Sequence, residues 1–362
     1  MKVLFRVDSS IRIGTGHIMR CLTLAQALTK QGVKTVFICR DLEGNLINKV
    51  IETGFEVKVL PRFTNTVYGT NNPKEAQDYS VWLEVDREVD ARETADIVSI
   101  EKPDWVVVDH YGIDQKWQQV ISKYDSKILV IDDLFNRKHL CDILVDQNYG
   151  SQRDKYVELV PASCQILCGP TYTLLRSEFK EHRILALNNR RSDSISTIIV
   201  SMGGVDEYNY TERVIDVLND SRLIGKVKEV IVLLGRNCPH QASIQNAAYS
   251  SQFNVKVLIE TDNVAQLLSK ADLAIGAVGS TTWERFCLGV PSILMVIAAN
   301  QNDIAKRLAR DKLIELAACT DDIPNILLEL LEDRTRLKLL SERPAEVIDA
   351  LGADRITEKI LS

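Results

Sequence analysis

A histidine, His17, follows two glycines just after the first apolar stretch of the chain. Residues Lys2–Val7 have the pattern of a strand, and His17–Lys30 have that of a helix. Gly14 and Gly16 allow a ligand to approach the backbone of the loop between them. A helix N-terminus disfavours imidazolium, so the ring of His17 stays neutral and able to accept a proton. The pattern predicts a catalytic base at His17 and substrate contacts at both glycines; the alternative is a histidine that only hydrogen-bonds within its loop.

The two glycines also resemble the beginning of a dinucleotide-binding fingerprint. Met19 occupies the position of the third glycine, and the basic Arg40 leads the residues after the second predicted strand, where the fingerprint needs an acidic one. We therefore expect no nicotinamide cofactor, and no other cofactor is predicted.

A second glycine-containing loop, Gly279-Ser280-Thr281, lies between a strand predicted over 272–275 and a helix. Small residues at a helix start expose backbone amides that suit a phosphate or diphosphate. Glu284 follows one turn into the helix, where a carboxylate fits a neutral diol such as a ribose. The loop and Glu284 are therefore predicted to bind a nucleotide; the alternative is a glutamate that stabilises the helix dipole.

Two further pairs of residues follow predicted strands. Gly203 and Gly204 come after a strand predicted over 196–201, where they suit nucleotide contact, although an ordinary turn explains them nearly as well. Asp109 and Tyr111 follow another strand and are predicted to contact substrate, with a helix cap or a buried structural acid as alternatives for Asp109.

A third pair, Asn300 and Gln301, opens the helix after an apolar stretch that ends at Val296. Polar side chains at this position can reach a sugar or phosphate, so both residues are predicted to bind substrate. Capping of the helix by Asn300 is an equal alternative.

Metal ligands are sparse in the sequence. The eight cysteines form no Cys-x-x-Cys, and the five histidines do not stand at usual zinc spacings. Asp132 and Asp133 resemble an acidic metal-binding pair, but without further ligands a turn explains them better. We expect reduced, buried thiols and no metal site.

The elements that must position these residues alternate between strand and helix, as in doubly wound α/β folds. The pattern restarts after a polar stretch over 188–193, which predicts two Rossmann-like domains over 1–190 and 191–362 that face each other across a ligand cleft. The first domain would carry the catalytic histidine, and the second would bind the nucleotide and end in a helical segment. The predicted strands are 2–7, 34–39, 55–60, 105–108, 127–131, 142–145, 196–201, 228–234, 254–259, 272–275 and 292–296.

Composition sets the class of protein. A length of 362 residues suits about two domains, and 45% hydrophobic with 26% charged residues is globular. With 44 basic and 50 acidic residues the net charge is −6, which argues against nucleic acid as a partner. The apolar stretch over 290–299 is shorter than the ~20 residues that span a bilayer, and the N-terminal apolar stretch is too short for a signal peptide. We expect a cytoplasmic monomer or weak oligomer that does not bind membranes.

Taken together, these motifs resemble those of a known family, the UDP-2,4-diacetamido-2,4,6-trideoxy-β-L-altropyranose hydrolases of pseudaminic acid biosynthesis. The chain is also similar to the related spore-coat polysaccharide biosynthesis proteins. The motifs that carry the resemblance, in chain order, are Arg6-x-Asp8, Ile13-Gly14-Thr15-Gly16-His17-x-Met19-Arg20-Cys21, Val108-Asp109-His110-Tyr111, Gly169-Pro170-x-Tyr172-x-Leu174-Leu175-Arg176-x-Glu178-Phe179, Met202-Gly203-Gly204-x-Asp206 and Gly279-Ser280-Thr281-x-x-Glu284.

The resemblance implies a GT-B fold and hydrolysis of a UDP-sugar substrate to UDP and a free 2,4-diacetamido sugar, without a metal. It also implies that His17 is catalytic and that Glu284 holds the ribose hydroxyls. With the base in one domain and the diphosphate in the other, water is expected to attack the anomeric carbon with inversion. Two alternatives remain: a GT-B glycosyltransferase with a UDP-sugar donor, and a non-catalytic nucleotide-sugar-binding protein of coat polysaccharide assembly.

Overall fold

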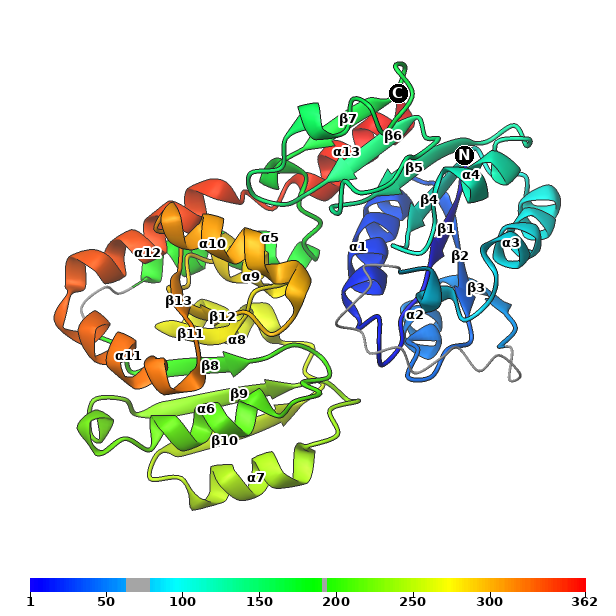
Figure 1. Ribbon diagram of the computed structural model, residues 1–362. Coiled ribbons are helices and arrows are strands. Elements are labelled where there is room, and N and C mark those ends of the chain that lie inside the picture. The colour runs from blue at the N-terminus through cyan, green and yellow to red at the C-terminus, as the bar shows by residue number, and fades with distance from the viewer. Residues whose placement is uncertain (63–78, 191–193) are drawn as a thin grey trace. The chain divides into compact units, whose positions relative to one another are not determined.

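The computed structural model describes residues 1–62, 79–190 and 194–362, and the chain forms two compact units (Figure 1). Unit 1 contains Met1–Leu174 together with Leu351–Ser362, and unit 2 contains Leu175–Ala350. Each is a parallel sheet with helices on both faces, which is the doubly wound arrangement that the strand–helix alternation predicts.

The division between the units differs from the boundary predicted near residue 190. Helix α5 (Ser177–Asn189) precedes the polar stretch but packs against α8 (Val264–Lys270) and α9 (Ser280–Cys287), so it belongs to unit 2. The last helix, α13 (Gly352–Leu361), returns to unit 1 and packs against α1 (Gly16–Lys30). The polar stretch over 188–193 includes the end of α5 and does not mark a domain boundary. The boundary between the units depends instead on which of the two sheets each helix packs against.

The sheet of unit 1 has the order β3-β2-β1-β4-β5-β6-β7. Its neighbouring strands all pair in parallel. The order reverses direction between the adjacent strands β1 and β4, which is where ligands bind in open sheets of this kind. The strands are β1 (Lys2–Val7), β2 (Lys34–Arg40), β3 (Glu56–Leu60), β4 (Trp105–Asp109), β5 (Lys127–Ile131), β6 (Ile143–Asp146) and β7 (Gln165–Cys168).

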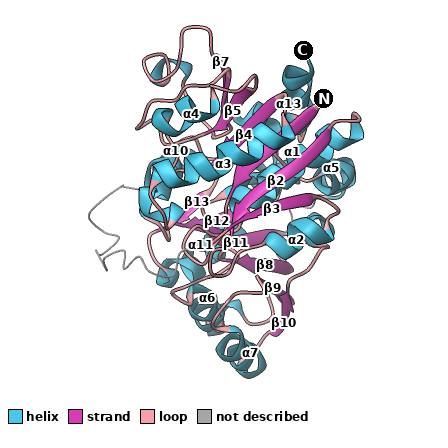
Figure 2. Ribbon diagram, turned by 90° about the vertical axis from the view of Figure 1, so that its right-hand side faces the viewer, coloured by secondary structure: helices cyan, strands magenta, loops and turns pink. Residues whose placement is uncertain are grey.

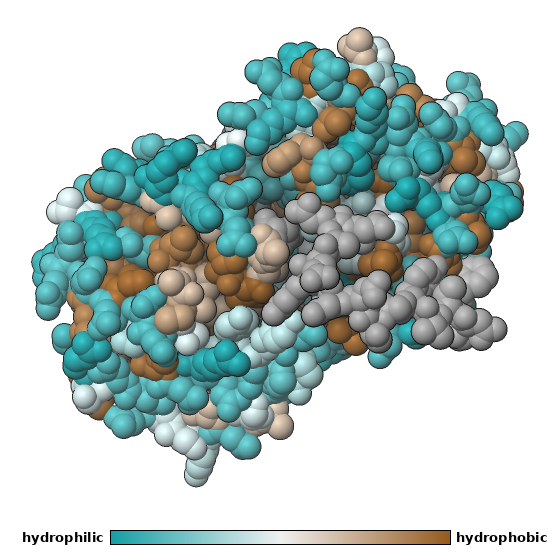
Figure 3. All heavy atoms as spheres, in the orientation of Figure 1, coloured by the Kyte–Doolittle hydropathy of each residue, from teal (hydrophilic) through white to brown (hydrophobic). Residues whose placement is uncertain are grey.

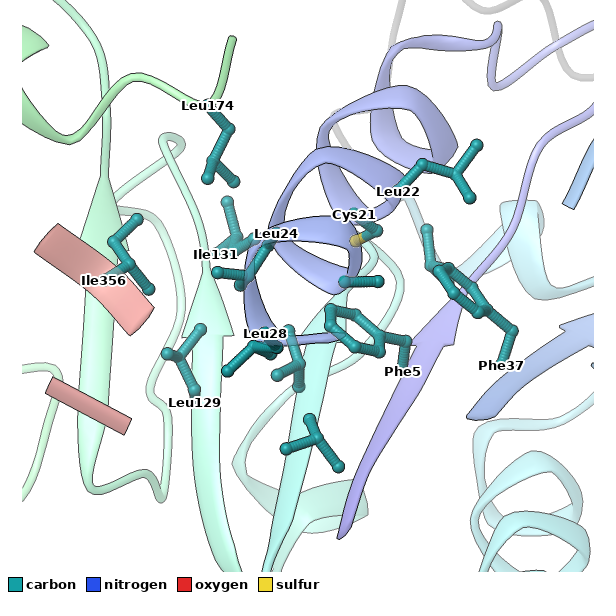
Figure 4. Packing of buried hydrophobic residues seen from close by; sticks show 14 of the residues in the cluster. Phe5, Cys21, Leu22, Leu24, Leu28, Phe37, Leu129, Ile131, Leu174 and Ile356 are labelled. Carbon is teal, nitrogen blue, oxygen red and sulfur yellow. The ribbon is translucent and has the colours of Figure 1, made fainter. Parts of the chain in front are cut away.

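Alternate residues of these strands face two separate hydrophobic clusters. On one face, Phe5 and Phe37 pack with Cys21 and Leu28 of α1, and Ile356 of α13 joins the same cluster (Figure 4). The opposite face packs against α3 (Arg87–Glu101) and α4 (Gln115–Ile121), which lie on the other side of the sheet from α1 in Figures 1 and 2. The short helix α2 (Ile47–Glu52) connects β2 to β3. Burial on both faces explains why the strands read as continuous apolar stretches.

The sheet of unit 2 has the order β10-β9-β8-β11-β12-β13, again with parallel neighbours, and it reverses direction between β8 and β11. Its strands are β8 (Thr197–Ser201), β9 (Glu229–Leu234), β10 (Asn254–Ile259), β11 (Leu273–Ala277), β12 (Ser292–Met295) and β13 (Glu315–Ala317). Its further helices are α6 (Tyr210–Leu218), α7 (Gln241–Ser250), α10 (Asn302–Arg310), α11 (Ile323–Glu332) and α12 (Arg334–Val347).

The face of the molecule drawn in Figure 3 is mostly hydrophilic, with apolar residues in separate patches. Within residues 1–62, 79–190 and 194–362, no helix has both the length and the apolar character needed to cross a bilayer.

Candidate active site and nucleotide site

His17 lies in the first turn of α1, directly after the loop that leaves β1. Gly14 has a positive φ of 78°, a conformation that glycine adopts without strain, and its amide donates to the carbonyl of Ser10 at 2.9 Å. Gly16 begins the helix. The two glycines therefore turn the chain so that His17 stands at the carboxyl end of β1.

Below this loop, Asp8 anchors the end of β1. Its Oδ1 accepts a hydrogen bond from Arg6 and one from the backbone amide of Arg40, both at 2.7 Å. Arg6 and Arg40 also pair with the buried carboxylate of Asp90. This fully buried ionic network holds the ends of β1 and β2 together beneath the loop that carries His17.

Asp109, the last residue of β4, lies directly behind His17. Nδ1 of His17 is 2.6 Å from Oδ1 of Asp109, and Arg20 donates from Nε to Oδ2 and from Nη2 to Oδ1, each at 2.6 Å. The thiol of Cys21 adds a contact of 3.5 Å to Oδ2. Asp109 has no exposed surface, whereas His17 retains 8%. Asp109 was predicted to contact substrate, but in the structure both of its carboxylate oxygens accept hydrogen bonds from protein side chains.

The electrostatics of this cluster fix the tautomer of His17. Burial alone would raise the pKa of Asp109, but the charge of Arg20 and the contact with His17 outweigh it and hold that pKa well below its usual range. An ionised carboxylate only accepts hydrogen bonds, so the short contact requires the proton on Nδ1 of His17. In the neutral ring Nε2 then carries the lone pair, and no described residue hydrogen-bonds to it.

Aromatic rings surround the imidazole. The ring of Tyr111 meets that of His17 edge-on at 4.8 Å, and Trp82 does so at 6.0 Å while stacking on Tyr111. Burial, with the nearby charge of Asp133, raises the pKa of Tyr111 well above its usual value, and its hydroxyl donates to Asp133 at 2.5 Å. Tyr111 thus lies beside His17 as a neutral phenol. Trp82, from the 3-10 helix η1 (Tyr79–Leu83), contacts both rings.

In unit 2, Gly203 and Gly204 follow β8. Gly203 has a positive φ of 97°, and the carbonyl oxygen of Gly204 lies only 2.0 Å from where a Cβ on Gly235 would stand. Asp206 caps α6 by accepting from the amides of Tyr210 and Thr211 at 2.8 Å. The backbone of this loop therefore passes close to that of Gly235, which follows β9.

The loop after β11 presents free amides at the start of α9. The hydroxyl of Thr282 accepts from the amide of Gly279 at 3.1 Å, and the amide of Thr282 donates back to the carbonyl of Gly279 at 2.9 Å. Ser280 is exposed, and no described group accepts from the amides of Ser280 or Thr281. Two unsatisfied amides at a helix N-terminus suit an anion.

Glu284, one turn into α9, is tied to α5 by an ion pair. Arg176 donates to its Oε1 at 3.2 Å and also pairs with Glu178 at 3.0 Å. Glu284 retains 15% side-chain exposure, and Oε2 makes no hydrogen bond to a described residue. Arg176 therefore orients the carboxylate through Oε1, and Oε2 stays able to accept a hydrogen bond from a ligand.

Gln301 and Asn300 lie in the 3-10 helix η5 (Ala299–Gln301), which precedes α10. The side-chain oxygen of Gln301 accepts from the amides of Ile297 and Ala298, at 2.9 and 3.3 Å. The side chain of Gln301 therefore caps this helical turn. The side chain of Asn300, for which capping and substrate contact were both considered, lies outside the described part of the structure.

Except for Asn300 and Gln301, which follow β12, the predicted residues lie at the carboxyl ends of the strands where the strand order of each sheet reverses. The residues at the edge of unit 1 are Gly14, Gly16, His17, Asp109 and Tyr111; those of unit 2 are Gly203, Gly204, Gly279, Ser280, Thr281 and Glu284. Sequence reasoning assigned no function in the site to Arg20, Trp82 or Arg176, and it explained Asp133 as part of a turn. Of these, Arg20 had a readable signal, since i and i+3 share a helix face with His17.

No group of three His, Cys, Asp or Glu side chains is placed to hold a metal ion in the part of the chain that the structure describes. The eight cysteines are free, and seven of them are buried or partly buried.

Comparisons with known proteins agree with the fold described above. Residues 197–356 match the glycosyltransferase family 28 C-terminal domain. The calicheamicin glycosyltransferase CalG4 superposes with a TM-score of 0.63 over 99% of this chain and 98% of its own, at 15% identity, a likeness that concerns the fold alone. The fold is GT-B-like.

Two curated relatives extend over most of the chain. The UDP-2,4-diacetamido-2,4,6-trideoxy-β-L-altropyranose hydrolase of Campylobacter jejuni is 28% identical over 311 residues, which is 86% of this chain and 97% of the relative. The spore coat polysaccharide biosynthesis protein SpsG of Bacillus subtilis is 24% identical and covers 83% of this chain and 79% of its own. The resemblance drawn from the motifs is confirmed.

Proposed function

We propose that the protein hydrolyses a UDP-linked sugar, releasing UDP and the free sugar. The observation that carries the proposal is the pair of His17 and Asp109, which leaves the lone pair on Nε2 of the imidazole. An imidazole oriented in this way is a general base for water. The similarity to the Campylobacter jejuni hydrolase supports a UDP-sugar as the substrate, and within that class we propose a 2,4-diacetamido-2,4,6-trideoxyhexose, as in pseudaminic acid biosynthesis.

In the proposed reaction, Nε2 of His17 accepts a proton from water as the water oxygen bonds to the anomeric carbon. The imidazolium that forms is stabilised by the carboxylate of Asp109. The bond between the anomeric carbon and the UDP oxygen breaks, and its electron pair leaves with UDP. Amides of Ser280 and Thr281 would stabilise the charge that develops on the diphosphate, so the proposal assigns no step to a metal.

The same cluster supports a single displacement with inversion. A double displacement with retention needs a carboxylate that attacks the sugar. Asp109, the carboxylate in contact with His17, is fully buried and both of its oxygens accept hydrogen bonds from protein groups. It is therefore unsuited to form a covalent glycosyl intermediate, and water is the nucleophile that the geometry favours.

The test is to incubate the protein with UDP-sugars in ¹⁸O-water without any acceptor and to analyse both products. We expect equimolar UDP and free sugar, with no ¹⁸O in the UDP because the carbon–oxygen bond breaks. Label in the terminal phosphate of UDP would mean attack at phosphorus and would remove the assigned role of His17.

The GT-B-like fold favours a glycosyltransferase as the second candidate. In that case UDP would appear only when an acceptor alcohol is added, and the sugar would be recovered on the acceptor. Binding of UDP-sugars without turnover under either condition would instead indicate a nucleotide-sugar-binding protein.

A further inference from the structure

Arg285 of α9 is a buried cation that has no carboxylate within ion-pair distance in the described part of the chain; the charge of Glu284 acts on it only from farther away. Its side chain is 2% exposed, and Nη2 donates to the carbonyl of Ala277 at 2.8 Å and to the hydroxyl of Thr282 at 3.3 Å. Nε has no hydrogen-bond partner, and no carboxylate of the described chain forms an ion pair with the guanidinium. Burying a charge without a partner is costly, so proteins seldom retain one that has no use.

The guanidinium lies beneath the point where the sheet of unit 2 reverses direction. Gly276 of β11 pairs in register with Ser201 of β8. A Cβ on Gly276 would stand 2.7 Å from Nη1 of Arg285 and 2.5 Å from the carbonyl oxygen of Ser201. The absence of a side chain at Gly276 therefore makes room for the cation against β11, next to β8, and the loops bearing Gly204 and Gly279 follow these two strands.

Arg285 is also connected to the anion-binding loop through Thr282. The hydroxyl of Thr282 accepts from Arg285 and from the amide of Gly279, which fixes the turn that leaves the amides of Ser280 and Thr281 free. Burial lowers the pKa of Arg285 to about 10, although the charge of Glu284 opposes this shift, so the side chain still carries its charge at neutral pH.

We propose that Arg285 is a positioning residue and a fixed positive charge for the diphosphate bound at the start of α9. It acts through Ala277 and Thr282 on the shape of the loop, and through its charge on the affinity for the anion. This inference rests on the proposed nucleotide site, since it concerns the diphosphate of the same ligand. If Arg285 were buried only to fill space, its replacement would affect folding but would not change the difference in affinity between a charged ligand and an uncharged one.

The test compares Arg285→Gln, which keeps hydrogen bonding but removes the charge, with Arg285→Lys, which keeps the charge. Calorimetry with UDP, uridine and inorganic pyrophosphate measures the contribution of the phosphates. We expect Arg285→Gln to lower the affinity for UDP and for pyrophosphate by about tenfold or more, while the affinity for uridine changes by less than about twofold. Arg285→Lys should retain most of the affinity for UDP and pyrophosphate.

Arg190→Gln is the matched control. Arg190 is partly buried and donates to the carbonyls of Ala271 and Leu288, and its Nε has no hydrogen-bond partner among the described residues. Ala271 lies before β11, at the amino end of that strand, whereas Arg285 contacts Ala277 at its carboxyl end. Arg190→Gln should lower the melting temperature and leave the ratio of UDP to uridine affinity unchanged.

The outcomes separate this inference from the proposed function. A wild-type protein that binds UDP and pyrophosphate in an Arg285-dependent manner but hydrolyses no UDP-sugar would support the inference and contradict the function. Equal loss of UDP and uridine affinity in Arg285→Gln, or no loss of either, would overturn the inference while leaving hydrolysis intact. If wild-type protein binds neither UDP nor pyrophosphate, both fail.

Discussion

Nδ1 of His17 lies 2.6 Å from Oδ1 of Asp109, and the carboxylate behind the imidazole has no exposed surface. His17 is in the first turn of a helix and Asp109 ends a strand 92 residues later in the chain. The contact arises because β1 and β4 are neighbours in the sheet and Val7 pairs in register with Asp109. Strand order therefore brings together an imidazole and the carboxylate that orients it.

Asp109→Asn should lower kcat of the proposed hydrolysis by about 10²–10⁴-fold with little change in KM. An amide at this position can donate to Nδ1 and so favour the tautomer that places the proton on Nε2. The variant also leaves Arg20 without its counter-charge, so activity should be normalised to folded protein, measured by circular dichroism at the assay temperature. Turnover close to that of the wild type in folded Asp109→Asn would show that the pair does not set the tautomer.

His17→Asn should lower kcat by a similar factor of about 10²–10⁴, because it removes the base but keeps a polar side chain of comparable size. KM should change little, since the nucleotide contacts that we propose lie in unit 2. Steady-state release of UDP measures both constants. A variant that keeps turnover but loses substrate affinity would make His17 a binding residue instead.

The sequence alone was sufficient to identify the candidate site residues that follow long, buried strands. His17, Asp109 and Gly203 were identified from their places after apolar stretches, because parallel strands end at a common edge. The edge strands β7 and β13 were not predicted. They are short, at four and three residues, and mix polar with apolar positions, so their sequences lack the signal of a buried strand.

Contacts that depend on tertiary packing could not be read from spacing. Arg176 and Glu284 are 108 residues apart and meet because α5 packs on α9, a helix that sequence reasoning assigned to the other domain. Arg285 stands beside a residue predicted to function, yet its burial beneath Gly276 becomes evident only once β8 and β11 are known to be neighbours.

Glu284→Ala should weaken UDP binding by about 1.5–3 kcal/mol, the usual worth of hydrogen bonds to a charged group. If the carboxylate accepts from ribose hydroxyls, the loss should be smaller for 2′-deoxy-UDP, and calorimetry with the two ligands measures the difference. Glu178→Ala is the matched control, because it removes the other carboxylate on Arg176. Equal losses for the two ligands would place the ribose contact elsewhere.

Excess EDTA should leave the rate of hydrolysis unchanged, because amides at the start of α9 are proposed to stabilise the leaving group. The assay is UDP release before and after chelation, followed by dialysis. Strong inhibition that a divalent ion reverses would contradict this expectation and would assign leaving-group stabilisation to the metal.

Asp146, at the end of β6, should make the stability of unit 1 depend on pH. Burial, with the charge of Asp133 nearby, raises its pKa to about 7. When protonated it can donate to the hydroxyl of Tyr156, which in turn donates to the carbonyl of Asp132 at 3.0 Å. An unfolded aspartate has a pKa near ~3.9, so the folded state binds the proton more tightly, and the stability gained from protonation is lost as pH rises from about 4 to 7. Asp146→Asn keeps a donor for Tyr156 without the charge.

Asp146→Asn should therefore raise the free energy of unfolding by about 1–3 kcal/mol at pH 8 and have little effect near pH 4.5, where the wild-type carboxyl is already neutral when folded. Urea unfolding of both proteins at the two pH values measures this, and the low-pH pair is the internal control. A variant that is destabilised equally at both pH values would show that Asp146 is ionised in the folded state and accepts from Tyr156. Its pKa would then lie below that of an exposed aspartate, and the carboxylate would be stabilised by its hydrogen bonds from Tyr156 and from the amide of Asn148.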